Sequence, residues 1–432
     1  INLILNTSVY PQLWKTGKIT PIFKSGDRKC IENYRPVTLL SNVSKVFESI
    51  LYNSIYDNVK GYISDHQHGF VKGRSTATNL ACVSHFIANA LDSNLQVDVI
   101  YTDFAKVFDR IDHGVLQKPG CYGISDPLMI LLKSYLCKRI CYVSIMGYHS
   151  SRLQVNSGVP QGSNLGPLLF LLFINDVLEL FSVRALLFAD DLKLFSTVNE
   201  LYDSQELQSN IDRLFGWSLK NNLELNISKC RVVSFSKRKH QVAFDYRINN
   251  ISIRRCSNIT DLGVTFDCEL TFSLHIEKVI SAALKMLGFI FRTCSQFTST
   301  CCLRSLYYTL VRSRLEYCSI VWSPYYVKYV AAVEGTQRKF AKYMWFKNFH
   351  EYPARGTSNA ILYDSANLKS LSVRRINSLL IFLYKILHGF IDSSFLLSLV
   401  SVNVPQMNLR AFRFFYIPKP NTNVLRHSPI FL

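Results

Sequence analysis

Residues 185–195 have the sequence Ala-Leu-Leu-Phe-Ala-Asp-Asp-Leu-Lys-Leu-Phe, in which two adjacent carboxylates, Asp190 and Asp191, stand between two apolar runs. This pattern predicts two short strands joined at an acidic tip. Neighbouring carboxylates raise each other's pKa unless a cation lies between them, and a divalent metal ion is the usual cation. Because Asp is also common in turns, the stretch taken alone favours an ordinary surface hairpin.

A third carboxylate changes this interpretation. Residues 96–104, Gln-Val-Asp-Val-Ile-Tyr-Thr-Asp-Phe, are rich in strand-forming side chains and predict a central strand with Asp103 at its C-terminal end. Two acidic clusters at strand ends can converge on two Mg²⁺ ions about 3.5–4 Å apart, the arrangement used for in-line phosphoryl displacement. Carboxylate oxygens suit Mg²⁺ and need no Cys or His ligands.

Between the two acidic clusters, residues 156–176 begin as a loop rich in Gly and Pro and continue as an apolar run after Pro167. Because Pro favours the first turn of a helix, the run predicts a buried helix. Gly158 and Gly162 allow a substrate to approach the main chain, and Gln161 offers an amide that can hydrogen-bond a sugar or a base. The alternative is a plain loop that caps a core helix, and the loop by itself favours this alternative at least equally.

Three segments follow one another in a recognisable order: Tyr-Thr-Asp-Phe-Ala-Lys-Val-Phe-Asp at 101–109, Ser-Gly-Val-Pro-Gln-Gly-Ser at 157–163 and Phe-Ala-Asp-Asp at 188–191. This order resembles motifs A, B and C of reverse transcriptases, particularly those of animal non-LTR (LINE-type, jockey-like) retrotransposons. Further segments resemble the two fingers segments, motif D, the primer-grip motif E and the region that follows it: residues 14–27, 33–41, 67–76, 222–230, 262–264, 314–324 and 337–340. The resemblance covers nearly the whole chain.

The resemblance implies an α+β right-hand polymerase fold. The implied parts are fingers at 1–95, a palm with motifs A to D at 96–240, a primer-grip hairpin at 241–268, a thumb-like helical region at 269–345 and a basic C-terminal extension at 346–432. We expect the palm to be a small antiparallel sheet with helices packed on one face. Apolar periodicity predicts a helix at 203–219, a hairpin at 251–266 and helices from residue 270 onward.

The resemblance also implies an activity and the residues that carry it. The chain would be an RNA-directed DNA polymerase, a nucleotidyltransferase that adds dNTPs to the 3′-hydroxyl of a DNA primer along an RNA template. Asp103, Asp190 and Asp191 would hold two Mg²⁺ ions, and Lys229 would protonate the departing pyrophosphate. The implied nucleotide-binding residues are Lys24, Arg35, Arg74, Phe104, Phe108, Gln161 and Gly162, and the implied primer-grip residues are Leu262 and Gly263.

Several of these residues also have a plainer interpretation. Basic side chains such as Lys24 and Arg74 are mostly solvated surface charges. Arg35 is the strongest of the three cationic candidates, because it lies beside an apolar strand-like run where a cation normally has an anionic partner. Phe108, the implied steric gate against a 2′-hydroxyl, can equally be a core aromatic, and both roles can hold at once. Lys229 is about equally well explained as an exposed lysine at a strand edge.

The composition favours a protein that binds nucleic acid. The chain has 49 Lys and Arg against 30 Asp and Glu, a formal net charge of +19, and such an excess neutralises phosphates and releases counterions. Most of the excess lies in residues 301–432, which contain 17 basic and 5 acidic residues. Aromatic residues interleave with it at 343–349 and 410–416, where rings can stack on unpaired bases, although we expect most aromatics to be core.

The twelve cysteines are scattered without a Cys-x-x-Cys pair or zinc-finger spacing, so we expect neither a zinc site nor a disulfide framework. Because no secretory signal precedes them, we expect reduced thiols in a nuclear or cytoplasmic ribonucleoprotein that is not secreted. The longest apolar stretches, residues 168–174 and 379–384, are too short to span a bilayer. We therefore expect no membrane association.

Three features depart from the family pattern. Pro119 and Gly120 lie where a helix usually follows motif A, and because Pro in a helix interior costs about 3 kcal/mol, we expect a shortened or bent helix. Asp261 stands where an aromatic residue usually precedes the primer-grip pair, and an acid there would repel the primer backbone. Ile1 is no initiator and no endonuclease domain precedes the fingers, so we expect a fragment of a longer element or a partly decayed copy.

Two functions therefore remain open at this level. The first is an active RNA-directed DNA polymerase, which the intact carboxylates at 103, 190 and 191 favour. The second is a catalytically decayed, retroelement-derived nucleic-acid-binding protein, which the departures at 119, 120 and 261 favour. An RNA-directed RNA polymerase would also use paired aspartates, but a ring as large as Phe108 would exclude ribonucleotides.

Overall fold

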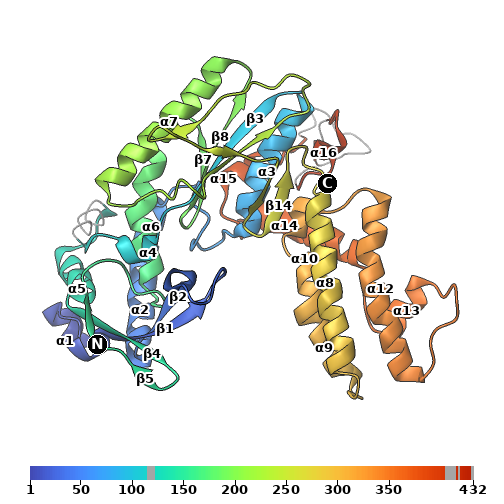
Figure 1. The fold of residues 1–432 in the computed structure, drawn as a ribbon, viewed down its shortest axis with the longest axis horizontal. Helices are drawn as coiled ribbons and strands as arrows, with labels where there is room; N and C mark the ends of the chain where they lie inside the picture. Colours follow the sequence, from blue (N-terminus) through green and yellow to red (C-terminus); the bar gives the residue numbers. More distant parts are fainter. Residues whose placement is uncertain (114–121, 404–414, 417–418, 430–432) are drawn as a thin grey trace.

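The computed structural model describes residues 1–113, 122–403, 415–416 and 419–429. It has three parts, arranged in Figure 1 around an open side of the molecule: a sheet with helices near the N-terminus, a second sheet at the top, and a set of long helices on the right. The segment that contains Pro119 and Gly120 lies outside the described residues. Before that segment, the helix after motif A is short, α4 (Val107–Arg110).

The central sheet forms where the palm is expected. Its order is β12 (Arg254–Arg255), β9 (Arg231–Phe235), β3 (Gln96–Thr102), β8 (Asp191–Val198) and β7 (Arg184–Phe188). Strand β3 is central and antiparallel to both β8 and β9, whereas the short β12 is parallel to β9. The predicted strand at 96–104 and the predicted hairpin around the acidic tip are therefore confirmed.

Helices cover both faces of this sheet, so the expectation of one covered face is wrong. Ile100 of β3 belongs to a core with α6 (Gly166–Ile174) and α7 (Leu201–Lys220), whereas Val97 and Val99 belong to a second core with α3 (Thr76–Asp92). Because successive strand residues point to opposite faces, a strand that is apolar at both parities must be buried on both. The helices predicted after Pro167 and at 203–219 are confirmed as α6 and α7.

The N-terminal part is built around a second sheet. Its strands are β2 (Tyr34–Leu39), β1 (Thr16–Phe23), β4 (Arg139–Ile145), β5 (Tyr148–His149) and β6 (Leu153–Val155). Strand β4 pairs in parallel with β1, although it lies inside the range 96–240 that was expected to form the palm. That range therefore supplies strands to both sheets. The same part of the molecule contains helices α1 (Asn2–Thr7), α2 (Asn42–Val59) and α5 (Asp126–Leu136) (Figure 1).

Two small hairpins precede the helical part. Strand β10 (Arg247–Ile248) pairs with β11 (Ile251–Ser252), and β13 (Asn258–Asp261) pairs with β14 (Val264–Asp267). The single hairpin expected at 251–266 is therefore divided, and only its second half forms a continuous hairpin. The division arises because β12 leaves this region to join the edge of the central sheet.

The chain beyond residue 270 is helical, as predicted. The helices are α8 (Ser273–Thr293), α9 (Thr300–Tyr307), α10 (Ser313–Glu316), α11 (Ser319–Trp322), α12 (Val327–Phe349), α13 (Asn359–Ser365), α14 (Leu371–Leu387), α15 (Ser394–Ser398) and α16 (Asn423–Arg426). Helix α8 packs against α12, while α15 and α16 return to α3 behind the central sheet (Figure 1). The expected C-terminal extension is thus part of the core that supports this sheet. No helix in the described part of the chain has the length and apolar character needed to cross a membrane.

Candidate active site

The acidic tip is the two-residue turn between β7 and β8. Phe188 pairs with Asp191, which leaves Ala189 and Asp190 to make the turn. Ala189 has φ 57°, a left-handed conformation that is uncommon for a residue with a side chain and costs about 1–3 kcal/mol. Such strain persists only where the surroundings hold it, and here Gln67 does so: its Oε1 accepts from Ala189 N at 3.0 Å and its Nε2 donates to Ala189 O at 3.2 Å.

Asp103 joins this turn through the register of the central sheet. Thr102, the last residue of β3, pairs with Leu192 of β8, so the next residue, Asp103, lies beside Asp191 at the same end of the sheet. The backbone carbonyl of Asp103 accepts from Asn226 N at 2.7 Å, which fixes the strand end. The sheet therefore places all three predicted residues, Asp103, Asp190 and Asp191, at the same end.

The charges of these carboxylates interact. Burial, together with the charge of Asp103, raises the pKa of Asp190, while Arg35 and Lys24 oppose the rise. Partial loss of hydration, followed by the charges of Asp190 and Asp261, raises the pKa of Asp191 to about 6. Both shifts mean that the fully ionised turn is electrostatically unfavourable by itself, and a cation placed there would relieve it.

Carboxylate oxygens suit Mg²⁺, but the side chains at this turn do not form a complete set of metal ligands. Among the described residues, no three His, Cys, Asp or Glu side chains converge as a ready-made metal cluster. Mg²⁺ commonly binds through one or two carboxylates and completes its shell with water and substrate phosphates. Asp103, Asp190 and Asp191 could hold the metal in this way, with a triphosphate supplying the remaining oxygens.

Lys229 lies directly beside the first carboxylate. Its Nζ is 3.2 Å from Asp103 Oδ2, and its side chain is 57% exposed. Lys229 follows the segment whose backbone is bound to Asp103, so it is held near the strand end but can still reach solvent. This position brings a proton donor to the carboxylates, as a general acid requires.

The loop that resembles motif B lies against the motif A segment. Gly158 N donates to Ile111 O. Gly158 has φ 79°, and a side chain would not fit there, because a Cβ atom would lie 2.5 Å from Phe108 O. Gln161 Nε2 donates to Asp109 Oδ1 at 2.9 Å, and Gln161 O accepts from Thr38 N. These contacts join β2 of the N-terminal sheet to the segment at α4 that follows Asp103.

Gly162 and Phe108 define the inner surface of this region. Gly162 has φ 110°, and a Cβ there would lie 2.9 Å from Thr38 O, so only glycine fits without strain. Phe108 is partly buried and packs against Phe170 with ring centroids 4.9 Å apart. Phe108 and Gln161 also line a cleft of about 340 Å³ between the N-terminal sheet and this loop. The ring is therefore both part of the core and part of a cavity wall.

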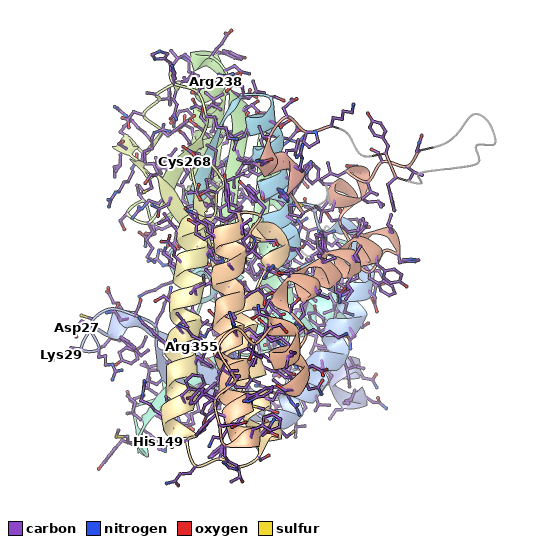
Figure 2. All side chains as sticks on the ribbon, turned by 90° about the vertical axis from the view of Figure 1, so that its right-hand side faces the viewer. Asp27, Lys29, His149, Arg238, Cys268 and Arg355 are labelled. Carbon is purple, nitrogen blue, oxygen red and sulfur yellow. The ribbon has the colours of Figure 1, made fainter. Side chains whose placement is uncertain are left out.

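Lys24 and Arg35 lie on the hairpin of β1 and β2. Both side chains are exposed, and neither makes an ion pair with any residue that the structure describes. Their charges nevertheless reach Asp190, because both lower its pKa. The tip of the same hairpin, with Asp27 and Lys29, projects away from the rest of the molecule in Figure 2. The hairpin thus offers free cations near the acidic turn.

Two predicted nucleotide-binding residues are placed differently by the structure. The side chain of Arg74 is 3% exposed and is bound by protein groups, including Asp65 and Asp392, so it does not face a nucleotide site. Phe104 is 4% exposed and packs on Trp217 with ring centroids 6.3 Å apart. Because adjacent extended residues point to opposite sides, the ring after Asp103 turns into the core.

The predicted primer-grip residues form the turn of the β13–β14 hairpin. Leu262 has φ 44° and Gly263 has φ 86°, the positive values that a two-residue type I′ turn requires. Tyr317 holds this turn, since its hydroxyl donates to Leu262 O at 2.9 Å. The hairpin is thereby anchored to the helical part.

Asp261, which precedes this turn, is buried and would not repel a primer backbone, contrary to the sequence-based expectation. The side chain of Asp261 is 4% exposed, and its Oδ2 is 2.5 Å from Nζ of Lys193, which is 1% exposed. Asn79 Oδ1 accepts a second hydrogen bond from Lys193 at 2.6 Å. Burial raises the pKa of Asp261, and Lys193 opposes this rise. The acid is therefore a buried counter-ion and not part of the primer surface.

Sequence reasoning missed two residues near the acidic turn: Gln67, which holds Ala189, and Lys193, which pairs with Asp261. Gln67 was only part of a motif, and nothing in its local pattern showed that it would hold Ala189, which is 122 positions away. Lys193 had a usable signal, because it lies at an inward position of an otherwise apolar strand. A lysine buried at such a position requires an acid nearby, but the sequence did not say which acid.

The histidine next to Gln67 leads to a test by pH. His68 is 1% exposed, and burial lowers its pKa to about 3, with Arg74 adding to the effect. Because the pKa of His68 is lower in the folded state than in the unfolded state, its contribution to stability is fully present above about pH 6.5 and is lost as the pH falls toward the folded pKa. We expect His68→Gln to lower the free energy of unfolding more at pH 7.5 than at pH 5. Below about pH 6.5 the loss should shrink by up to about 1.4 kcal/mol for each pH unit. Urea denaturation at both pH values would measure this difference.

The exposed His149, at the surface in Figure 2, provides the matched control. His149→Gln should show the same cost at both pH values. A cost of His68→Gln that does not change with pH would contradict the assignment of His68 as a neutral buried residue.

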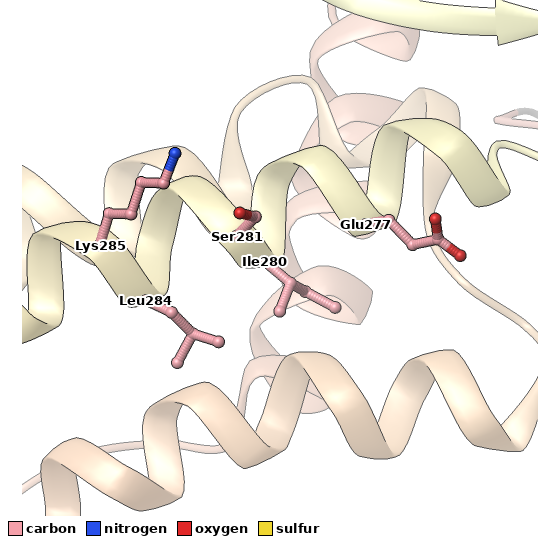
Figure 3. A pocket seen from close by; sticks show the side chains of 5 residues that line it. All are labelled: Glu277, Ile280, Ser281, Leu284 and Lys285. Carbon is pink, nitrogen blue, oxygen red and sulfur yellow. The ribbon is translucent and has the colours of Figure 1, made fainter.

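A second hollow lies along α8. It has a volume of about 510 Å³ and is lined by one face of the helix, with Ile280 and Leu284 pointing to the same side and the Lys285 amine pointing away (Figure 3). None of its lining residues was predicted as a site residue. The carboxylates and this hollow are thus separate features of the molecule.

Comparisons with known proteins identify the family of this chain. The family model for reverse transcriptase (RNA-dependent DNA polymerase) matches residues 22–291. The chain is 30% identical over 293 residues to the RNA-directed DNA polymerase from mobile element jockey of Drosophila melanogaster, an alignment that covers 65% of this chain and 32% of that protein. It is 32% identical over 287 residues to the probable RNA-directed DNA polymerase from transposon X-element of the same species, covering 64% and 32%.

Among solved structures, the apo telomerase from Candida tropicalis matches with a TM-score of 0.50 and 14% sequence identity. The match covers 91% of this chain and 66% of that chain, and at this identity it shows the fold alone, the right-hand polymerase fold. The chain spans about a third of the length of the curated relatives. Because the family model matches more than half of its residues, the chain belongs to the reverse transcriptase (RNA-dependent DNA polymerase) family.

Proposed function

We propose that this chain is an RNA-directed DNA polymerase of a non-LTR retrotransposon and adds dNTPs to a primer 3′-hydroxyl. The observation that carries the proposal is the strand register, which places Asp103 beside Asp191 and next to the turn that holds Asp190. The exposed cations Lys24 and Arg35 lower the pKa of Asp190, so a triphosphate bound at this turn would meet positive charge from the neighbouring hairpin. The partners of the reaction are an RNA template, a DNA primer and dNTPs.

The proposed chemistry is a nucleotidyl transfer. The primer 3′-hydroxyl releases its proton to water and its oxygen forms a bond to the α-phosphorus of the dNTP, while the bond from that phosphorus to the bridging oxygen breaks and pyrophosphate leaves. Two Mg²⁺ ions bound by the carboxylates would supply the charge that favours hydroxyl deprotonation and pyrophosphate departure. Lys24 and Arg35 orient the triphosphate, and Lys229 holds the proton that the pyrophosphate accepts.

The direct test is primer extension by the purified chain on a primed RNA template. We expect addition of dNTPs in the presence of Mg²⁺, little addition of NTPs and no addition with EDTA. A parallel binding measurement with the same primed template separates the two functions that the sequence leaves open. Binding without extension would favour a catalytically decayed nucleic-acid-binding protein, to which the excess of basic residues is equally suited.

Phe108 should select deoxynucleotides. Because its ring lines the cleft beside Gln161, a 2′-hydroxyl placed against it would clash, and removing the ring would remove the exclusion. We expect Phe108→Ala to raise ribonucleotide incorporation relative to deoxynucleotide incorporation roughly 10- to 200-fold, the range for one small group in a fitted pocket. Single-nucleotide extension with matched dNTP and NTP pairs measures this ratio.

The matched control is Phe104→Leu, because that ring faces Trp217 in the core. It should lower stability without changing sugar selection. Unchanged discrimination in Phe108→Ala would remove this residue as the gate, whereas altered discrimination in Phe104→Leu would show that the core ring also contributes.

The cellular setting is part of the proposal. We propose that the chain works in a ribonucleoprotein in the nucleus, the cytoplasm or both, and that an endonuclease domain carried elsewhere in a longer protein supplies the nicked target. Support comes from the basic composition and from the relatives, of whose length the alignments cover only 32%.

A further inference from the structure

Arg74 uses its whole guanidinium group inside the protein. Nε donates to Asp392 O at 2.8 Å, Nη1 donates to Ser64 O and Gln67 O at 2.6 and 2.8 Å, and Nη2 donates to Asp65 and Asp392 carboxylates at 3.1 and 2.8 Å. These bonds use all five N–H donors of an arginine. A side chain that is bound so completely acts as a fixed bracket, and its position depends on its partners.

The decisive partner comes from the far end of the chain. Asp392 lies between α14 and α15, 318 positions after Arg74, and also donates its backbone N–H to Gly73 O. Ser394 Oγ donates to Asp65 Oδ2 at 2.6 Å, which ties the second acid to the same C-terminal segment. This segment, residues 392–394, therefore determines where the Arg74 guanidinium lies.

The bonds of Arg74 connect to the turn at Ala189 and Asp190 through Gln67. Gln67, whose carbonyl oxygen Arg74 binds, is also the residue whose side-chain amide holds both the N–H and the carbonyl of Ala189. Gly69 adds a steric constraint, because a Cβ there would lie 2.2 Å from Ala189 N. The strained turn that carries Asp190 is thus held by a loop, and Arg74 holds that loop.

From these contacts we infer that Asp392 is a positioning residue for nucleotidyl transfer, acting through Arg74 and Gln67 on the turn that presents Asp190. The inference rests on the proposed function, but the structural link can be measured without it. Asp392 touches neither substrate nor metal; it supplies the counter-charge and acceptors that keep a buried guanidinium in place. The C-terminal segment is consequently part of the catalytic apparatus.

Removing the carboxylate should displace the bracket. In Asp392→Ala, Nη2 keeps only Asp65 as a charged partner, so the carbonyls of Ser64 and Gln67 are held less firmly. We expect kcat for dNTP addition to fall roughly 10- to 100-fold, the effect of displacing a reacting group by about 1 Å. KM for dNTP should change little, because Lys24 and Arg35 lie on another part of the chain.

Hydrogen exchange followed by mass spectrometry tests the link in the full chain. Asp392→Ala should exchange faster than wild type in peptides covering residues 64–70 and 185–192, and no faster in residues 16–39 of the N-terminal sheet. Arg74→Lys, which keeps the charge but loses the fork, should give the same pattern. Asp364→Ala removes an exposed acid on α13 and should match wild type.

The outcomes separate this inference from the proposed function. If wild type extends no primer but Asp392→Ala still increases exchange at 185–192, the positioning link stands and the proposed function fails. If exchange at 185–192 is unchanged in Asp392→Ala, the link is wrong whatever the activity. Faster exchange with unchanged kcat in an active enzyme would also overturn the positioning role.

Discussion

Replacing Asp190 with alanine is expected to reduce primer extension about a thousandfold while binding of primed template stays near the wild-type level. The turn would lose a carboxylate that Asp103 and Asp191 cannot replace, because Asp103 follows β3 and Asp191 begins β8, so neither lies at the turn position. Metal-assisted stabilisation of developing charge is worth several kcal/mol, and about 4 kcal/mol corresponds to a thousandfold change in rate. Single-turnover extension on an RNA template measures the loss.

An acidic residue away from the turn provides the control. Asp212 is exposed on α7, and Asp212→Ala should extend primers as wild type does. Equal extension by wild type and Asp190→Ala would mean that the carboxylates no longer carry catalysis. Loss of template binding in Asp190→Ala would instead point to misfolding, which circular dichroism would reveal.

Replacing Asp261 with alanine is expected to destabilise the chain by about 3–5 kcal/mol, the range for a buried charge that loses its partner. Lys193 would remain at 1% exposure with only Asn79 as an acceptor. The lost ion pair joins β8, which begins at Asp191, to β13 of the primer-grip hairpin. We therefore expect primer extension to decrease as well. The midpoint of urea denaturation, monitored by tryptophan fluorescence, measures the loss of stability.

A double variant separates the unpaired charge from the cavity. Lys193→Met combined with Asp261→Leu replaces the pair with apolar side chains, and such replacements are often neutral or stabilising. We therefore expect the double variant to be more stable than Asp261→Ala alone. Equal destabilisation of both would show that lost packing, and not the unpaired lysine, dominates.

Local sequence patterns were sufficient for the catalytic framework. The strand-forming run at 96–104 became β3, the apolar runs around Asp190 became β7 and β8, and Pro167 began α6. These predictions succeeded because side-chain alternation and helix periodicity depend on neighbours within a few residues. The order of the motifs along the chain then identified the family.

The sequence alone was insufficient wherever a side chain has a distant partner. Arg74 and Phe104 belong to motifs that resemble nucleotide-binding segments, yet one is bound by Asp392 and the other packs on Trp217. The parallel pairing of β4 with β1 had no local signal either. Such contacts join residues that are tens or hundreds of positions apart, and no local pattern encodes them.

The sequence by itself thus determined the family, the polymerase fold and the three carboxylates of the candidate site. Only the tertiary structure decided that Asp261 is a counter-ion for Lys193 and that the turn carrying Asp190 depends on Gln67, Arg74 and Asp392. The physical reason is burial: once a charge leaves water, it must be neutralised by whatever group the fold places against it, and that group is chosen by packing and not by proximity in the sequence.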